Sequence, residues 1–310
     1  MAEVTASLVK ALRDRTGAGM MDCKAALIET GGDMEQAVDW LRKKGLSKAA
    51  KKAERAATDG LVGAITNGKV GAIVEVNSET DFVARNAQFQ ELVRTITSLA
   101  PQAEGDLARL LAAPYPGKGA PVDEHVKAMV ATIGENMSVR RTAAVSVGEG
   151  VVAEYVHNKV ADGLGRIGVL VGLESSGDKA ALSNLGRQIA MHIAAASPAA
   201  VRAEELDPVL VERERAVYTE QAKASGKSAE IAAKMVEGRL RKEFFQQVVL
   251  LQQTFLGAGG DGKATVEQVV KGAEKAVGAP IAIASFVRFG LGEGDKGGAE
   301  PGEAGAAGKA

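Results

Sequence analysis

The sequence predicts an α+β protein whose core is built from two halves that share one plan. Two observations lead to this prediction. The spacing of apolar residues changes from helical to strand-like after about residue 60, and residues 68–76 recur in kind at residues 165–173. A second match pairs residues 145–150 with residues 289–294. Each half is therefore expected to hold a small antiparallel sheet with helices on one face.

The first 45 residues precede this core and predict three short helices. Val4, Leu8 and Leu12 are spaced along one helical face, and Thr5 can cap that helix. The Gly-Ala-Gly run at residues 17–19 breaks the helix. Three helices of this length bury only a modest core, which suits a docking module.

Two acidic residues predict where the next helices begin. Asp22 is expected to cap the second helix, which ends at the glycine pair 31–32. Asp33 stands three residues before Gln36, the spacing of a capping box, and opens a third helix that Gly45 is expected to end.

Residues 42–55 form a strongly basic segment. Two interpretations stay open: a solvated helical linker, because most charge runs are only solvated, or a contact with an acidic partner surface. The basic residues are Arg42, Lys43, Lys44, Lys48, Lys51, Lys52 and Arg55, against the single acid Glu54.

The core begins with a predicted β-hairpin. Apolar runs at residues 61–65 and 71–76 flank Asn67-Gly68, a strong hairpin signal. After Asn77 a helix is expected, with Phe82, Phe89, Leu92, Ile96 and Leu99 on one stripe. Prolines from Pro101 onward predict looser structure before a helix at 122–133 and a strand at 139–147.

Residues 206–244 interrupt the second half as a predicted helical hairpin. Asp207-Pro208 can start one helix, residues 225–227 form the turn, and Ile231 and Met235 belong to the return helix. The Gly- and Ala-rich tail, residues 293–310, is expected to be disordered.

The composition excludes several function classes. With 38 basic and 39 acidic residues there is no overall attraction to nucleic-acid phosphates, and 4% aromatic residues provide few stacking platforms. The lone Cys23 excludes an intramolecular disulfide framework. No signal peptide or membrane span is recognisable, so a cytoplasmic protein is expected.

A search for catalytic or cofactor motifs supports no enzyme. His125, His157 and His192 lack the spacing of metal ligands. Residues 163–168 spell GxGxxG but precede a predicted strand instead of following one, so the match does not indicate a dinucleotide site. We expect no catalytic residue, metal or cofactor of the protein's own.

The segment Thr80-Asp81-Phe82 allows two interpretations. Thr80 or Asp81 can simply cap a helix whose Phe82 points into the core. The repeat places Asp178-Lys179 at the equivalent position, so the shared fold does not require an aromatic there. That favours an added role for Phe82, as an anchor in a partner's pocket.

The chain resembles the elongation factor Ts family along nearly its whole length, to about Gly294. The resemblance rests on motifs that occur in the family's order. They are residues 16–27 (TGAGMMDCKAAL), 80–86 (TDFVARN), 133–136 (IGEN), 166–171 (RIGVLV), 189–192 (IAMH) and 234–239 (KMVEGR).

The resemblance implies a domain organisation that agrees with the element pattern. It comprises a ubiquitin-associated-like module with its basic linker, a core of two subdomains, an inserted antiparallel coiled-coil hairpin and a tail. The expected ranges are 1–55, 56–140 for the first subdomain, 141–205 with 245–292 for the second, 206–244 for the hairpin and 293–310 for the tail.

The resemblance also implies a mechanism: nucleotide exchange on the GTPase elongation factor Tu. Asp81 and Phe82, with Thr80, would enter the partner's nucleotide domain, disturb its Mg²⁺ and phosphate site and release GDP. Further implied contacts are Arg13, Met20, Met21, Lys24, Lys52, Ile133, Gly134 and His157. The hairpin is a candidate arm for a homodimer.

Two departures from the family pattern bear on these contacts. The stretch after His157 is longer than expected, and the tail lacks the amphipathic helix of some members. The main alternative is an adaptor that binds other proteins through the three-helix module, and a structural scaffold is a third possibility.

Overall fold

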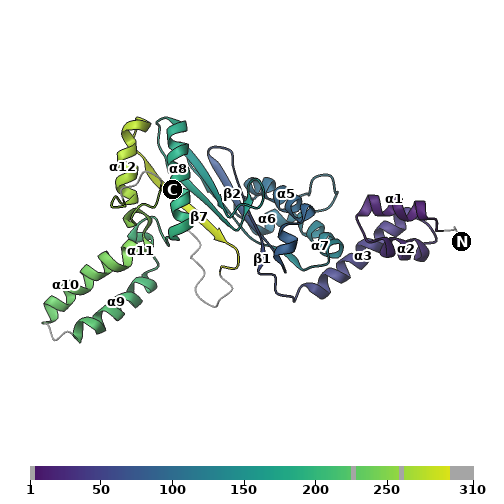
Figure 1. Cartoon of the computed structure of the whole chain (residues 1–310), viewed down its shortest axis with the longest axis horizontal. Helices are drawn as coiled ribbons and strands as arrows, with labels where there is room; N and C mark the ends of the chain where they lie inside the picture. Colours follow the sequence, from purple (N-terminus) through teal and green to yellow (C-terminus); the bar gives the residue numbers. More distant parts are fainter. Residues whose placement is uncertain (1–3, 225–227, 258–261, 294–310) are drawn as a thin grey trace. The chain divides into compact units, whose positions relative to one another are not determined.

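The computed structural model describes residues 4–224, 228–257 and 262–293, and it confirms the predicted α+β class (Figure 1). The chain divides into two compact units. Unit 1 comprises Met1–Gly63, Val74–Ala143 and Lys159–Arg166, and unit 2 comprises Ala64–Ile73, Ala144–Asn158 and Ile167–Ala310. The domain boundaries expected from the sequence stay predictions.

Unit 1 begins with α1 (Ala6–Thr16), α2 (Met20–Glu29) and α3 (Met34–Lys52). Thr5 caps α1 by accepting the Leu8 N–H, and Asp33 caps α3 by accepting the Gln36 N–H. Gly17 ends α1 with φ +70°, a backbone conformation that favours glycine. The three helices share a small core made of Val9, Leu12, Cys23, Ala26, Leu27 and Ala37.

Two boundary predictions in this region are wrong. Gly45 does not end the third helix: α3 continues to Lys52, and Gly45 lies buried within it. A Cβ at Gly45 would lie 3.3 Å from the Ala131 Cβ, so the glycine allows α3 to approach α7 closely. Asp22 does not cap α2, because the N-cap is Gly19. Its carboxylate instead binds Lys44 at 3.1 Å and Lys48 at 2.7 Å.

The predicted hairpin at Asn67-Gly68 is confirmed as β1 (Asp59–Thr66) and β2 (Val70–Ser78). The Asn67 Oδ1 accepts the Val70 N–H, and Gly68 has φ +97°. With β3 (Met137–Ser146) and β5 (Leu164–Gly165) these strands form a sheet of order β3-β2-β1-β5.

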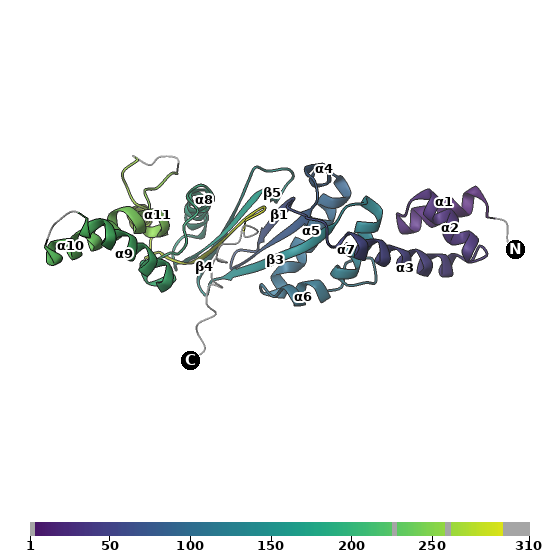
Figure 2. The ribbon, with the colours of Figure 1, turned by 90° about the horizontal axis from the view of Figure 1, so that it is seen from below.

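The helices of unit 1 follow in chain order: α4 (Asp81–Ala84), α5 (Ala87–Ala103), α6 (Leu107–Ala112) and α7 (Val122–Ile133). The predicted helix at 122–133 is thus confirmed, and α3 lies beside it (Figure 2). The expected stripe is correct for Phe89, Leu92 and Ile96, which are buried, but it does not include Phe82.

The reason is a break between α4 and α5. Asn86 caps α5 with its side chain, accepting from Gln88 and Phe89, so α5 starts anew after Phe82. The prolines were also misinterpreted in part, because Pro101 lies inside α5 near its end.

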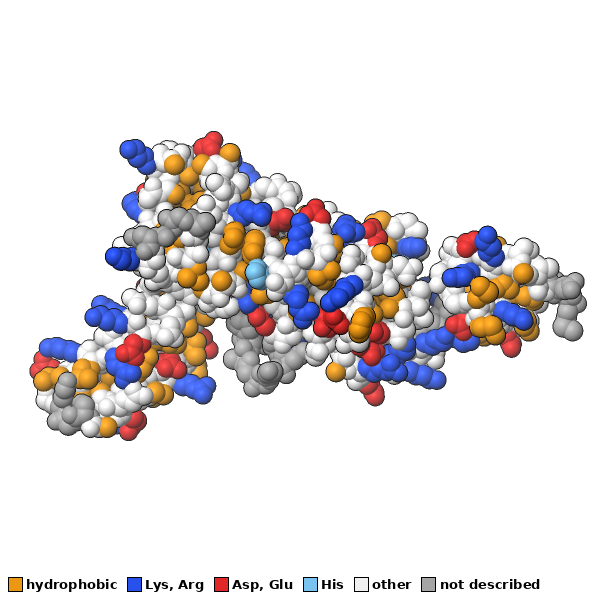
Figure 3. Space-filling model, viewed as in Figure 1, with side chains coloured by type: hydrophobic (Ala, Val, Ile, Leu, Met, Phe, Trp, Pro, Cys, Tyr) orange, Lys and Arg blue, Asp and Glu red, His pale blue; other side chains and the backbone are white. Residues whose placement is uncertain are grey.

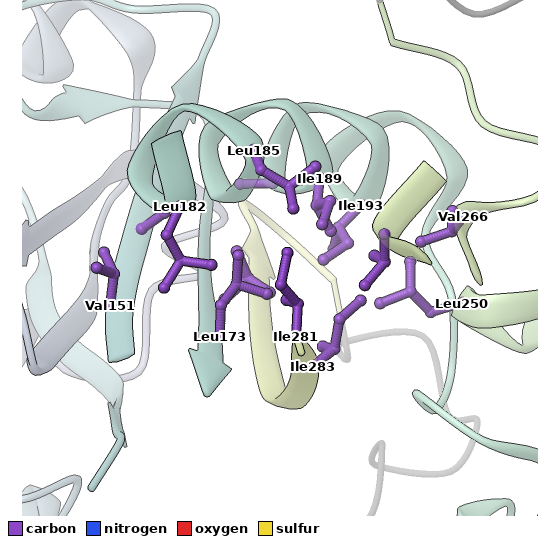
Figure 4. Close-up of a cluster of buried hydrophobic side chains, with 14 of the residues drawn as sticks. Val151, Leu173, Leu182, Leu185, Ile189, Ile193, Leu250, Val266, Ile281 and Ile283 are labelled. Atoms are coloured by element: carbon purple, nitrogen blue, oxygen red, sulfur yellow. The ribbon is translucent and has the colours of Figure 1, made fainter. Parts of the chain in front are cut away.

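Unit 2 contains β4 (Gly150–His157), β6 (Ile167–Glu174) and β7 (Ala282–Gly290), all antiparallel. The repeated stretches therefore form strands in both cases, β2 and β6. Helices α8 (Lys179–Ala196) and α12 (Val266–Val277) pack on this sheet around a core that includes Leu173, Leu182, Ile189 and Ile283 (Figure 4).

The expected helical hairpin is present as α9 (Pro208–Lys223) and α10 (Ala229–Arg239), preceded by η1 (Ala203–Glu205) and followed by η2 (Leu240–Phe245), α11 (Gln246–Val248) and η3 (Leu250–Gln252). Asp207 caps α9 by accepting the Val209 N–H. The predicted turn at 225–227, and the tail from residue 294, lie outside the described residues. Among the described helices, none has the length and apolar character needed to cross a membrane.

The glycines give a test of this packing. A Cβ on Gly63 would lie 2.1 Å from the Thr97 Oγ1 of α5, so Gly63→Ala should lower the free energy of unfolding by about 1–3 kcal/mol through overpacking. Gly238→Ala is the matched control, because a Cβ at that position would have no neighbouring atom within 4 Å among the described residues. It should raise stability by about 0.5–1 kcal/mol, because alanine favours a helix over glycine. Denaturant unfolding measures both, and equal effects would contradict the packing described for Gly63.

Candidate partner-binding surface

Residues 79–85, here called the Phe82 turn, carry the most exposed aromatic side chain described in the chain. The Phe82 side chain is 78% exposed, whereas its neighbours Val83 and Ala84 are buried. The single helical turn of α4 directs those two residues inward and leaves Phe82 outside. Of the two interpretations made from the sequence, a core role for Phe82 is therefore excluded.

Thr80 occupies the N-cap position of α4 without capping it. Its hydroxyl donates to the Glu135 Oε1 at 2.8 Å, and its backbone N–H donates to the Glu135 Oε2 at 3.1 Å. The Thr80 carbonyl accepts from the Ser78 hydroxyl at 3.1 Å. Polar side chains on both sides thus hold the start of the turn.

Asp81 is the first residue of α4, and its carboxylate lies 3.1 Å from the Arg85 guanidinium. Both side chains are partly exposed, so this pair stabilises the turn by at most about 1 kcal/mol. Asp178 behaves differently: it is the N-cap of α8 and accepts the Ala181 N–H at 2.7 Å. The equivalence of the two aspartates does not extend to a common capping role.

The loop that follows α7 lies against the Phe82 turn. Gly134 ends α7 with φ +95°, and its carbonyl accepts from the Lys52 ammonium. The Asn136 N–H donates to the Glu79 Oε1 at 2.6 Å, and the Asn136 amide donates to the Arg55 carbonyl at 2.8 Å. The structure therefore brings together three separately predicted sets of contact residues: Thr80–Phe82, Ile133–Gly134 and Lys52.

The other predicted contacts of unit 1 lie on α1 and α2, and all four have exposed side chains. Met20 is 58% and Met21 is 76% exposed, and Arg13 and Lys24 are exposed as well. Apolar side chains reach the surface of these helices at the right of Figure 3. Ile28, also 58% exposed, extends the same surface along α2 and was not predicted.

Most of the basic segment 42–55 is engaged within the chain. Lys44 and Lys48 bind Asp22, Arg42 pairs with Glu124, and Arg55 lies 3.6 Å from Glu79. These side chains form ion pairs with α2, α7 and the Phe82 turn, so the segment is not a free linker, although Arg42 and Arg55 stay largely exposed. Contact of the segment with an acidic partner stays a prediction.

His157, the last predicted contact, belongs to unit 2 and ends β4 with an exposed side chain. Its Nδ1 lies 3.0 Å from the Tyr155 hydroxyl. This bond fixes the ring at the end of the strand.

The other two histidines have structural positions. The His192 Nδ1 accepts the Leu256 N–H at 3.2 Å, so its Nε2 carries the proton donated to the Gln253 Oε1 at 2.9 Å. His125 stacks on Tyr115 with ring centroids 4.0 Å apart. Across the described ranges, no group of three or more His, Cys, Asp or Glu side chains is arranged to hold a metal ion.

Glu135 is a second residue of this surface that sequence reasoning missed. It lies within the motif of residues 133–136, but its two hydrogen bonds reach 55 positions back along the chain. Nothing in the local pattern indicates such a contact.

Comparison with known proteins decides the family. Residues 79–293 match the family model described as "Elongation factor TS". The chain belongs to the elongation factor TS family. Elongation factor Ts of Parvibaculum lavamentivorans is 63% identical over 294 residues, which cover 95% of this chain and 94% of that protein. The proteins of the same name from Rhizobium leguminosarum bv. trifolii and Rhodospirillum centenum are each 56% identical, with the same coverage.

The family resemblance stated from the sequence motifs is therefore confirmed, and with it a place in translation elongation. The family match begins at residue 79, the first residue of the Phe82 turn, and covers β3 to β7, whereas β1 and β2 precede it.

The half-buried position of His125 and the buried position of His192 predict a dependence of stability on pH. Burial, aided by Lys118, lowers the pKa of His125 to about 4 from 6.5, and burial lowers the pKa of His192 in the same direction. The unfolded chain therefore binds protons first, so the free energy of unfolding should fall as the pH is lowered from 6.5 toward 4.

Denaturant unfolding at several pH values in this window measures the effect. His125→Gln should show a smaller fall than the unmodified protein, whereas the control His157→Gln, altered at an exposed site, should keep the full fall. An unchanged pH dependence in His125→Gln would contradict the role of burial.

Proposed function

We propose that this chain binds elongation factor Tu in its GDP state and promotes GDP release, so that GTP can bind. Family membership supports this function, and the exposed Phe82 is the observation that carries it to particular residues. A large apolar ring held in water stabilises nothing in the free protein, but it is a suitable anchor for a partner's pocket.

In this proposal Phe82 inserts between helices of the partner's nucleotide domain. The ring stands on a short helix whose last two side chains, Val83 and Ala84, are buried in unit 1. The wedge is thus rigidly mounted and loses little conformational freedom on binding.

Asp81 acts beside it on the groups that hold the partner's Mg²⁺. Its carboxylate is bound in the free protein only through an exposed pair with Arg85, which is easily exchanged for other partners. Weakening the hold on the ion leaves the GDP phosphates less neutralised, so GDP dissociates faster. The Mg²⁺ and GDP belong to the partner, and the chain needs no cofactor of its own.

The remaining contacts provide affinity in the same proposal. The exposed side chains of α1 and α2 bind the same domain of the partner, and the loop after α7 adds to that surface. The residues are Arg13, Met20, Met21, Lys24, Lys52, Ile133 and Gly134, with His157 as a contact from unit 2.

Linkage sets the energetics of the cycle. If the factor weakens GDP binding, GDP must weaken the binding of the factor by the same free energy. The nucleotide-free complex is then an intermediate that incoming GTP dissociates. No covalent bond changes, so the protein acts as an exchange factor and not as an enzyme.

Several finer expectations belong to this proposal. The helices α1–α3 act as a ubiquitin-associated-like module, α9 and α10 as a coiled-coil hairpin that can pair two copies, and the protein works in the cytoplasm without direct contact to nucleic acid or membrane. The adaptor alternative is not favoured, because the family match covers residues 79–293, outside the three-helix module, and the relatives of that family align with 95% of the chain.

The function is tested by the release of fluorescent GDP from elongation factor Tu, with and without the protein. Release should accelerate at micromolar or lower concentrations of the factor. An unchanged release rate at micromolar protein would refute the proposed function.

Phe82→Ala tests the assignment to the Phe82 turn. Truncating a central anchor typically costs about 2 kcal/mol or more, so exchange at a fixed low factor concentration should slow about 30-fold. The melting temperature should stay nearly unchanged, because the ring is 78% exposed. Leu256→Ala, which truncates another apolar side chain that is 62% exposed, is the matched control and should exchange normally. A large loss of stability in Phe82→Ala would speak against the anchor role.

A further inference from the structure

We infer that Glu135 is a positioning residue for nucleotide exchange: its carboxylate holds the Phe82 turn in the orientation that Asp81 and Phe82 need to act on the partner. The inference rests on the proposed function and adds to it a residue that has no expected contact with the partner. It is carried by the bonds between Glu135 and Thr80.

Both oxygens of Glu135 are committed to one residue. Oε1 accepts the Thr80 hydroxyl at 2.8 Å and Oε2 accepts the Thr80 N–H at 3.1 Å. Two parallel hydrogen bonds to a carboxylate fix orientation as well as distance. Because Thr80 immediately precedes α4, the direction of its N–H sets the direction in which the helical turn leaves β2.

The Thr80 hydroxyl bonds to Glu135 and does not cap α4. A threonine at an N-cap ordinarily accepts a backbone N–H of the first helical turn. In α4 this cap bond is missing, and the hydroxyl donates to Glu135 instead. A helix of four residues without a cap has little stability of its own, so its position depends on the packing of Val83 and Ala84 and on what holds its first residue.

The loop that carries Glu135 is itself fixed on both sides. Gly134 accepts from Lys52, and the Asn136 N–H donates to Glu79, the residue before Thr80. The Asn136 amide also donates to the Arg55 carbonyl. Glu135 therefore connects the Phe82 turn to a support that includes the end of α3 and the end of α7.

This arrangement predicts which step of exchange depends on Glu135. In the proposed function the exposed face of α2 provides affinity for the partner, whereas the Phe82 turn acts in the state in which GDP leaves. A loose turn should therefore lower the maximal release rate more than the affinity, since only interactions made in the activated state change that rate. Misplacement of a reacting group by about 1 Å can slow a reaction up to about a hundredfold.

The test measures fluorescent GDP release from elongation factor Tu over a range of factor concentrations. Glu135→Ala should lower the maximal rate about tenfold and change the half-saturating concentration less than about threefold, by the reasoning just given. Met21→Ala is the contrasting variant, which should raise the half-saturating concentration by a larger factor than it lowers the maximal rate.

A double-mutant cycle identifies the bond responsible. Thr80→Val, which removes only the hydroxyl, should slow exchange in the unmodified protein but add little in the Glu135→Ala background. Thr80→Ser keeps the hydroxyl and the N–H, so it should retain both hydrogen bonds and, unlike Thr80→Val, nearly full exchange activity. If Glu135→Ala does not fold, the comparison of Thr80→Val with Thr80→Ser decides the question alone.

Three outcomes overturn the inference in distinguishable ways. A maximal rate in Glu135→Ala equal to that of the unmodified protein rejects Glu135 and leaves the proposed function intact. Additive effects of the two substitutions reject the coupling between Glu135 and Thr80. No acceleration by the unmodified protein rejects the function and this inference together, although amide hydrogen exchange at residues 81–85 still shows whether Glu135 orders the turn.

Discussion

Helix α3 packs closely against α7 at Gly45, which has no side chain. A Cβ at Gly45 would come within 3.3 Å of the Ala131 Cβ, which is closer than most such contacts. Two polar contacts join the same parts of unit 1: Arg42 pairs with Glu124, and Lys52 donates to the carbonyl of Gly134. Lys44 and Lys48 of the same helix bind Asp22 of α2 instead.

The same approach determines where the loop after α7 lies, and this loop carries Glu135 and Asn136 to the Phe82 turn. The turn thus receives its support from residues far along the chain, while its own helix contributes a single turn. Polar groups at the base of the turn are bonded, and the apolar ring of Phe82 at its tip is in water. In most folded proteins large apolar side chains are buried and polar side chains are exposed. An exposed aromatic ring on a support of bonded polar groups is typical of a surface that binds a partner.

The sequence predicted what local rules decide and missed what distant contacts decide. The hairpin at Asn67-Gly68, the caps Thr5 and Asp33 and the helix at 122–133 all follow from short-range geometry. Gly45 was wrongly predicted to end a helix, since its packing against Ala131 is a contact with a distant part of the chain. Asp22 was wrongly predicted to cap a helix, since its partners Lys44 and Lys48 lie on another helix. Phe82 was distinguished by comparison with the second repeat and by family resemblance, not by periodicity, which placed it in the core.

Glu135 could not be found from the sequence for a further reason. A carboxylate two residues after a helix end is ordinarily solvated, and only the fold shows that both of its oxygens face Thr80. An exchange factor makes no chemical bond, so its active groups need not be nucleophiles, acids or metal ligands, the types that motif searches detect. What it needs is a wedge and a carboxylate held in a fixed direction, and the groups that fix the direction are recognisable only by the bonds they make. For such a protein the supporting residues carry as much of the mechanism as the residues that touch the partner.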